Sequence, residues 1–166
     1  MSSFIFPPIR NHHKTIPWTL NEEEMGNATA QFDLHTLTEE QIKKRRELIR
    51  NCMEQEKDEV KEGKPSSCMA GRGAFWISWD GKMYPCGMLP NFSQDIRAMD
   101  FHSAWEETCE SMKQVNLPKE CSECKYQKIC PSCAAIFFSV NGKSNQIAEE
   151  LCARTKAYVT AFLGDT

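Results

Sequence analysis

The sequence predicts an α+β fold, in which a small cysteine-rich domain combines a β-hairpin and a cysteine-bearing loop with flanking α-helices. Two observations predict this fold. β-Branched and aromatic residues fill two short stretches on either side of Asp80-Gly81, and that dipeptide is a strong hairpin signal. Apolar residues recur at helical spacing in three other stretches, at 38–60, 100–112 and 147–162.

Residues 4–10, "FIFPPIR", begin as a short apolar strand. Pro7 and Pro8 stop it, because proline cannot donate to a sheet ladder. The stretch from there to about residue 35 is polar and aperiodic, so we expect a loop.

One long amphipathic helix follows. Thr38 and Gln41 form a capping box, and the helical pattern continues until Gly63. The basic run at 43–46, "KKRR", resembles a nucleic-acid patch, but acidic residues lie four positions before two of its lysines. This spacing is typical of a solvated, ion-paired helix face and favours that interpretation.

The hairpin strands are "AFWISW" at 74–79 and "KMYPC" at 82–86. Trp76 and Trp79 could line a peptide groove, but aromatic residues in a hairpin are more often core residues, and we expect that here. Asp100 caps a short helix whose apolar face contains Trp105, Cys109 and Met112. The apolar face of the last helix places Cys152 in its first turns.

The composition excludes several classes of protein. The chain has 166 residues and a net charge of -3, which gives no general attraction to nucleic acid or anionic membranes. Its longest apolar runs fall far short of the roughly 20 residues that a membrane span needs. No basic stretch followed by an apolar one opens the chain, so we expect a cytoplasmic, reducing location. Nine cysteines in that compartment indicate metal binding or catalysis rather than disulfides.

Seven of these cysteines form an ordered pattern around a hairpin glycine. The pattern runs Cys68, Gly81, Cys86, then a cluster of four at 121–133, then Cys152. Thiolates are soft ligands that select zinc, copper(I) or iron-sulfur clusters. Seven thiols in one region are enough for more than one tetrahedral site, so the sequence predicts two centres.

This pattern resembles the SPASM domain, the auxiliary-cluster domain at the C-terminus of many radical SAM enzymes. That family has C-x(9 to 15)-G-x4-C, a gap, C-x2-C-x5-C-x3-C, a gap, and a last cysteine. The resemblance covers roughly residues 65–160. The chain departs from the pattern at one place, because two residues rather than three separate Cys130 from Cys133.

The resemblance implies two 4Fe-4S clusters with interleaved ligands. By position, the second auxiliary cluster is assigned Cys121, Cys124, Cys130 and Cys152. The first is assigned Cys68, Cys86 and Cys133, which leaves it one ligand short. Candidates for the missing ligand are Cys52, Cys109, His12 and His13; otherwise one iron keeps an open position. Cys52 and Cys109 lie on apolar helix faces, where a cysteine often packs as a small hydrophobe.

The resemblance also implies a division of the chain and a parent enzyme. Residues 1–64 are expected to be the end of a partial β/α barrel, a loop and a linker helix, and 65–166 the SPASM domain. The radical SAM motif C-x3-C-x2-C is absent from the sequence. We therefore expect a C-terminal fragment that does not cleave S-adenosylmethionine alone and works with a radical SAM barrel in cis.

The expected function is electron transfer, substrate positioning or both, in an enzyme that modifies a peptide or protein. Expected reactions include thioether formation, epimerisation and formylglycine formation, with an external electron donor as a further partner. Two alternatives remain open. C-x2-C pairs also suit a zinc-binding structural or interaction module, although the five-residue gap between the pairs is shorter than in common zinc ribbons. A thiol oxidoreductase is a weaker alternative, because the βαβ surroundings of that motif are missing.

Overall fold

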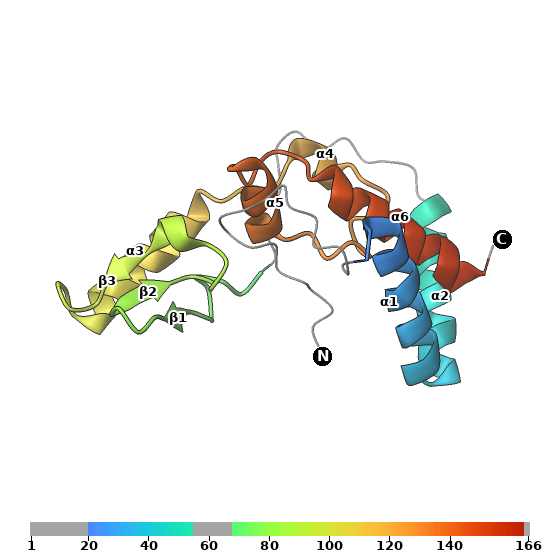
Figure 1. Cartoon of the computed structure of the whole chain (residues 1–166), viewed down its shortest axis with the longest axis horizontal. Helices are drawn as coiled ribbons and strands as arrows, with labels where there is room; N and C mark the ends of the chain where they lie inside the picture. The colour runs from blue at the N-terminus through green and yellow to red at the C-terminus, as the bar shows by residue number, and fades with distance from the viewer. Residues whose placement is uncertain (1–19, 55–67, 165–166) are drawn as a thin grey trace. The chain divides into compact units, whose positions relative to one another are not determined.

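The computed structural model describes residues 20–54 and 68–164 (Figure 1). Six α-helices, a short 3-10 helix and a three-stranded antiparallel sheet make up this described part, in agreement with the expected α+β class. The chain forms two compact units with interleaved segments. Among the described residues, we call 20–54, 123–132 and 148–164 the helical unit, and 68–122 and 133–147 the hairpin unit. The predicted strand at 4–10 lies outside the described residues.

Three helices form the helical unit: α1 (Glu22–Thr36), α2 (Glu39–Glu54) and α6 (Glu149–Leu163). In Figure 1, α1 and α2 run beside α6. The core between them consists of one buried residue from α1, one from α2 and three from α6, namely Ala30, Ile49, Tyr158, Val159 and Phe162. The terminal helix is therefore the central element of this unit.

The helix α1 corrects the prediction of a loop that reaches residue 35. Asn21 caps it: the Asn21 side chain accepts from the Glu24 amide at 2.9 Å, and the Glu24 carboxylate accepts from the Asn21 amide at 2.8 Å. Three glutamates in the first turn also favour the helix dipole. The buried face contains only Met25, Gly26 and Ala30. A face with one large apolar side chain produces almost no periodic signal in the sequence.

The capping box before α2 is confirmed. Gln41 Oε1 accepts from the Thr38 amide at 2.9 Å, and Thr38 Oγ1 accepts from the Gln41 amide at 3.4 Å. The structure confirms the helix from Glu39 to Glu54; the predicted continuation past Glu54 lies outside the described residues. Of the two expected lysine–glutamate pairs, Lys44 Nζ lies 2.6 Å from Glu40 Oε1.

The hairpin unit contains a sheet with the strand order β1-β2-β3. β1 (Trp76–Ile77) pairs with β2 (Lys82–Tyr84), which pairs with β3 (Gln94–Asp95), a strand that the sequence did not predict. The hairpin turn has three loop residues rather than two, since the Ser78 amide bonds to the Lys82 carbonyl at 2.9 Å. Gly81 takes a left-handed conformation there (φ 76°), which only glycine adopts without strain.

The helix α3 (Phe101–Lys113) is confirmed, with Asp100 as its N-cap. Its buried face is Ala104, Thr108 and Met112, so Trp105 and Cys109 are only half-buried. The remaining elements are a 3-10 helix η1 (Pro90–Phe92), α4 (Lys119–Ser122) and α5 (Ala134–Asn141). Within the described residues, no helix is long and apolar enough to cross a membrane.

The expectation that the hairpin tryptophans are core residues is wrong. Trp76 is 60% exposed and Trp79, in the loop of the hairpin, is 97% exposed. The sheet instead buries Met83, the central residue of β2. Phe75, just before β1, makes edge-to-face contacts with Phe101 and Trp105 of α3, at centroid distances of 5.5 and 5.6 Å.

Candidate metal-cluster site

The hairpin unit brings three predicted ligands together. The thiol of Cys133 interacts electrostatically with the thiols of Cys86 and Cys68. Cys86 follows β2, Cys68 lies at the start of the described part of this unit, and Cys133 directly precedes α5. These residues form what we call the hairpin trio, and they are the three residues assigned by resemblance to the first cluster.

Local turns orient two sulfurs of the hairpin trio. The Sγ atom of Cys68 lies 3.5 Å from the Ala70 amide, and that of Cys86 lies 3.4 Å from the Met88 amide. Each amide belongs to the residue two positions after the cysteine. Amides directed at a sulfur stabilise its thiolate form and are a usual feature around cluster ligands.

The helical unit brings together a second group of three. The thiol of Cys152, in the first turn of α6, interacts with the thiols of Cys130 and Cys124. Turns fold the loop that carries these two cysteines, with the Cys130 amide 2.7 Å from the Tyr126 carbonyl and the Gln127 amide 3.0 Å from the Cys124 carbonyl. We call Cys124, Cys130 and Cys152 the helical trio.

One thiol in each trio, that of Cys133 and that of Cys152, has a raised pKa. Burial is the largest cause for Cys133, and the neighbouring thiols of Cys86 and Cys68 act in the same direction. Amides of Ala135 and Ile136, at the start of α5, lower the pKa of Cys133 in part. For Cys152, burial again comes first, followed by Cys130 and Cys124. Thiolates packed this way repel one another, and a cationic metal centre removes that repulsion.

The donor set fits an iron-sulfur cluster in its chemistry, since each trio consists of soft sulfur ligands. All nine cysteines are described, and none takes part in a disulfide. Across 20–54 and 68–164, no three His, Cys, Asp or Glu side chains are arranged to hold one metal ion. That finding concerns single ions, whereas the irons of a cubane cluster occupy separate corners.

The other predicted ligands lie in neither trio. Cys121 lies in α4, within the hairpin unit, three positions before Cys124 in the sequence. Cys52 is buried in α2 of the helical unit, and Cys109 is half-buried in α3. His12 and His13 lie outside the described residues. The ligand roles of all seven cysteines, and the fourth ligand of the first cluster, stay predictions.

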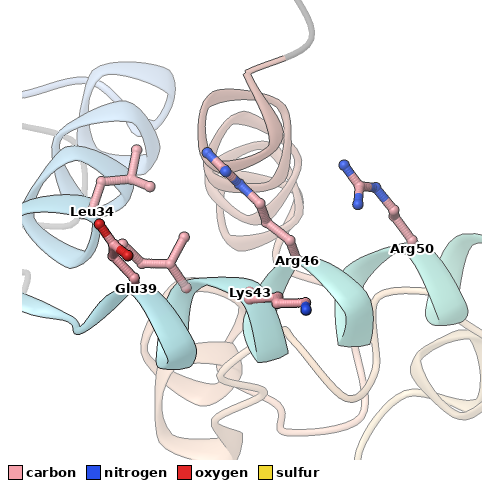
Figure 2. Close-up of a pocket in the computed structure, with 6 residues that line it drawn as sticks. Leu34, Glu39, Lys43, Arg46 and Arg50 are labelled. Atoms are coloured by element: carbon pink, nitrogen blue, oxygen red, sulfur yellow. The ribbon is translucent and has the colours of Figure 1, made fainter.

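A hollow of about 390 Å³ on α2 is lined by two residues of the basic run at 43–46, Lys43 and Arg46, and by Arg50. Figure 2 shows Lys43, Arg46 and Arg50 along α2, with Leu34 of α1 nearby. Arg46 has a structural role, because its Nε atom donates to the Phe162 carbonyl at 3.2 Å, in the last turn of α6. A cation at a helix C-terminus also favours the helix dipole. The hollow therefore fits the predicted solvated helix face.

Comparison with known proteins gives the class of the chain's relatives. No family model and no solved structure matches the chain. Curated relatives of the radical SAM class do match, over about half of this chain. The chain is therefore related to part of an AdoMet-dependent enzyme.

These relatives share one name, AdoMet-dependent heme synthase. The protein of that name from Methanosarcina barkeri is 33% identical over 85 residues, which cover 49% of this chain and 24% of the relative. Those from Oleidesulfovibrio alaskensis and Nitratidesulfovibrio vulgaris are 33% and 32% identical, over 51% and 52% of this chain and 22% and 24% of the relatives. The chain thus spans about a quarter of the length of these curated relatives.

Proposed function

We propose that this chain binds two auxiliary 4Fe-4S clusters and serves as the cluster domain of a radical SAM enzyme. One observation supports the proposal: the Cys133 thiol interacts electrostatically with the thiols of Cys86 and Cys68, and the Cys152 thiol with those of Cys130 and Cys124, a grouping compatible with the SPASM resemblance. The clusters supply one-electron chemistry or a Lewis-acidic iron. The chain's own residues hold and orient them.

The SPASM resemblance assigns Cys121 to the second cluster as its fourth ligand, and in this proposal the first cluster keeps one iron for an exchangeable ligand. Because each trio joins distant segments, cluster binding adds to folding stability. Cys133 and Cys130 are separated by two residues yet belong to different trios. The shortened spacing is therefore compatible with two centres.

The partners belong to the proposal as well. We infer an AdoMet-cleaving radical SAM barrel in cis and an external electron donor. The SPASM resemblance favours a peptide or protein substrate. The shared name of the relatives favours a second candidate, a tetrapyrrole of the heme class.

Anaerobic purification with iron and sulfide reconstitution tests the clusters. We expect brown protein with about eight irons and eight sulfides per chain, which is two cubanes. Cys86→Ala and Cys124→Ala should each lose about half of the iron, because each removes a ligand from one cluster only. Cys109→Ala and Cys52→Ala are matched controls that should keep the full content.

Three results would contradict the proposal. Well-ordered protein without iron or labile sulfide after reconstitution excludes clusters, and zinc in that protein supports the alternative structural module. Unchanged iron in Cys86→Ala excludes the hairpin trio. Complete loss of both clusters in Cys109→Ala means that the ligand assignment is wrong.

A further inference from the structure

A second hollow, of about 200 Å³, lies among the elements of the helical unit. Its walls come from α1, α2, α6 and the loop that carries Cys130. We call it the Arg45 pocket, and the residues that matter for its chemistry are Asp33, Arg45, Ile129, Pro131, Arg154 and Tyr158. It is polar on its helical walls and apolar on the loop side.

Most of the polar groups in this pocket already have partners. The Tyr158 hydroxyl donates to Asp33 Oδ2 at 2.8 Å, and Arg154 Nη2 lies 2.7 Å from Glu22 Oε2. Arg45 is different: in the part of the chain that the structure describes, its guanidinium has no hydrogen bond or ion pair. It is half-buried, which restricts its hydration. An arginine in this position is an unused, planar hydrogen-bond donor.

The Arg45 charge acts on the Tyr158 hydroxyl, which lines the same pocket. Burial and the bond to Asp33 raise the pKa of Tyr158, and Arg45 lowers it in part. Two guanidinium groups line the pocket against the single carboxylate of Asp33. Because Arg154 is already paired with Glu22, Arg45 is the cation of this lining whose donors can serve a ligand.

The pocket also adjoins the helical trio. Ile129 and Pro131, on its apolar side, flank Cys130 in the sequence. Thr155 belongs to the lining too, and its hydroxyl lies 3.3 Å from Cys130 Sγ. A group bound here is therefore separated from a cluster ligand by one side chain.

We propose that the Arg45 pocket binds a carboxylate arm of the substrate, and this rests on the proposed function. Arginine recognises carboxylates through paired hydrogen bonds, which an amide or ester does not form. A cavity of about 200 Å³ is smaller than the ~300–1,000 Å³ of sites that enclose a whole small molecule. It fits one arm of a larger molecule whose remainder lies outside. Both proposed substrate classes carry such arms, as acidic side chains or termini in peptides and as alkyl carboxylates in heme-type tetrapyrroles.

Propionate is the simplest probe, and propionamide is its uncharged control. The full chain, reconstituted anaerobically, should show a rise in thermal midpoint with propionate and none with propionamide, because ligand binding to the folded state stabilises it. Arg45→Gln should weaken propionate binding about tenfold or more, by loss of the paired donors. Arg45→Lys should bind propionate with an affinity between those of the unmodified chain and Arg45→Gln, since lysine keeps the charge but lacks the paired donors of the guanidinium group.

Arg50→Gln is the matched control, because Arg50 is an exposed arginine of the same helix outside this pocket. It should bind propionate as the unmodified chain does. Equal stabilisation by propionamide, equal propionate binding in Arg45→Gln, or no stabilisation at roughly 100 mM would overturn the proposal. Far-UV circular dichroism establishes that each variant is folded.

Two further pairs of probes assign the source of the carboxylate. A glutamate-containing peptide is compared with its glutamine analogue, and protoporphyrin IX with its dimethyl ester. If the acid of one pair binds more tightly than its neutral analogue, and this preference requires Arg45, the result supports the pocket and identifies the substrate class of that pair. If acid and neutral probes bind equally in both pairs, the result contradicts the pocket. Iron and sulfide are counted in the same samples, so missing clusters count against the proposed function and not against the pocket.

Discussion

The hydroxyl of Thr155 lies 3.3 Å from Cys130 Sγ and 2.9 Å from the Leu151 carbonyl, at a residue that is only 4% exposed. A threonine hydroxyl has one proton, so it donates to only one of these acceptors at a time. When Cys130 binds iron, its sulfur carries more negative charge and becomes the better acceptor. Thr155 is then a positioning residue that acts on the cluster through a ligand.

Replacing this hydroxyl should change the reduction potential of one cluster. Hydrogen bonds to ligand sulfurs stabilise the more negative, reduced cluster. Thr155→Val should therefore shift the second cluster to a more negative potential, and Thr155→Ser should restore most of the difference. Redox titration followed by electron paramagnetic resonance measures this shift, with the other cluster as an internal reference.

Thr108→Val provides the control for that measurement. Thr108 is also buried, and its hydroxyl donates to the Ala104 carbonyl at 2.8 Å rather than to sulfur. This variant removes a buried threonine hydroxyl without touching a predicted ligand, so both potentials should stay unchanged. Equal shifts in the two valine variants would mean that the Thr155–Cys130 contact has no specific effect.

Truncating a buried side chain of the hairpin should change the free energy of unfolding far more than truncating an exposed one. Met83 is fully buried, and Met83→Ala should lower the free energy of unfolding by about 2–5 kcal/mol, since it leaves a cavity. Trp79 is almost fully exposed, so Trp79→Ala should change it by no more than about 0.5 kcal/mol. Urea titration of each variant with the same cluster content measures both values. A large loss for Trp79→Ala would show that another part of the protein covers this side chain.

The ion pair between Asp95 and Arg97 should be visible as a pKa. Hydrogen bonds from the Arg97 side chain, 2.8 and 3.0 Å long, lower the pKa of Asp95 from 3.8 to about 2. Because the folded value is depressed, the stabilisation is present above pH 3.8 and is lost as the pH falls toward 2. Arg97→Gln should return the pKa of Asp95 toward 3.8, as a carboxyl-detected NMR titration would show, whereas Arg72→Gln should leave it in place.

Local chemistry made several elements predictable from the sequence. The capping box at Thr38, the Asp100 cap and the turn at Gly81 each depend on residues a few positions apart, and each is present. Local sequence is enough to predict such features, because the groups that form these hydrogen bonds lie within the same turn. The assignment of cysteines to two clusters came from the SPASM resemblance instead, and it stays a prediction.

Features that depend on distant contacts were missed or misjudged. The helix α1 packs on α6, more than 100 residues later, through small side chains and the Tyr158–Asp33 bond. Trp76 belongs to a stretch of β-branched and aromatic residues that is typical of a core strand. In the structure, however, it lies in a two-residue strand at the edge of the sheet. The Arg45 pocket joins α2 to residues of α1, α6 and the cysteine loop. No pattern within one segment contains that information.

Gly26 tests the contact between α1 and α6 directly. In an isolated helix, replacing glycine with alanine is favourable by roughly 0.5–1 kcal/mol. Here a Cβ atom would clash with the Arg154 carbonyl and with the Ala157 side chain. Gly26→Ala should therefore lower the free energy of unfolding by about 1–3 kcal/mol, as overpacking does. Asn27→Ala, at the next and exposed position of α1, should be neutral or slightly stabilising in the same urea titration. Stabilisation by Gly26→Ala would mean that the two helices do not approach each other at this position.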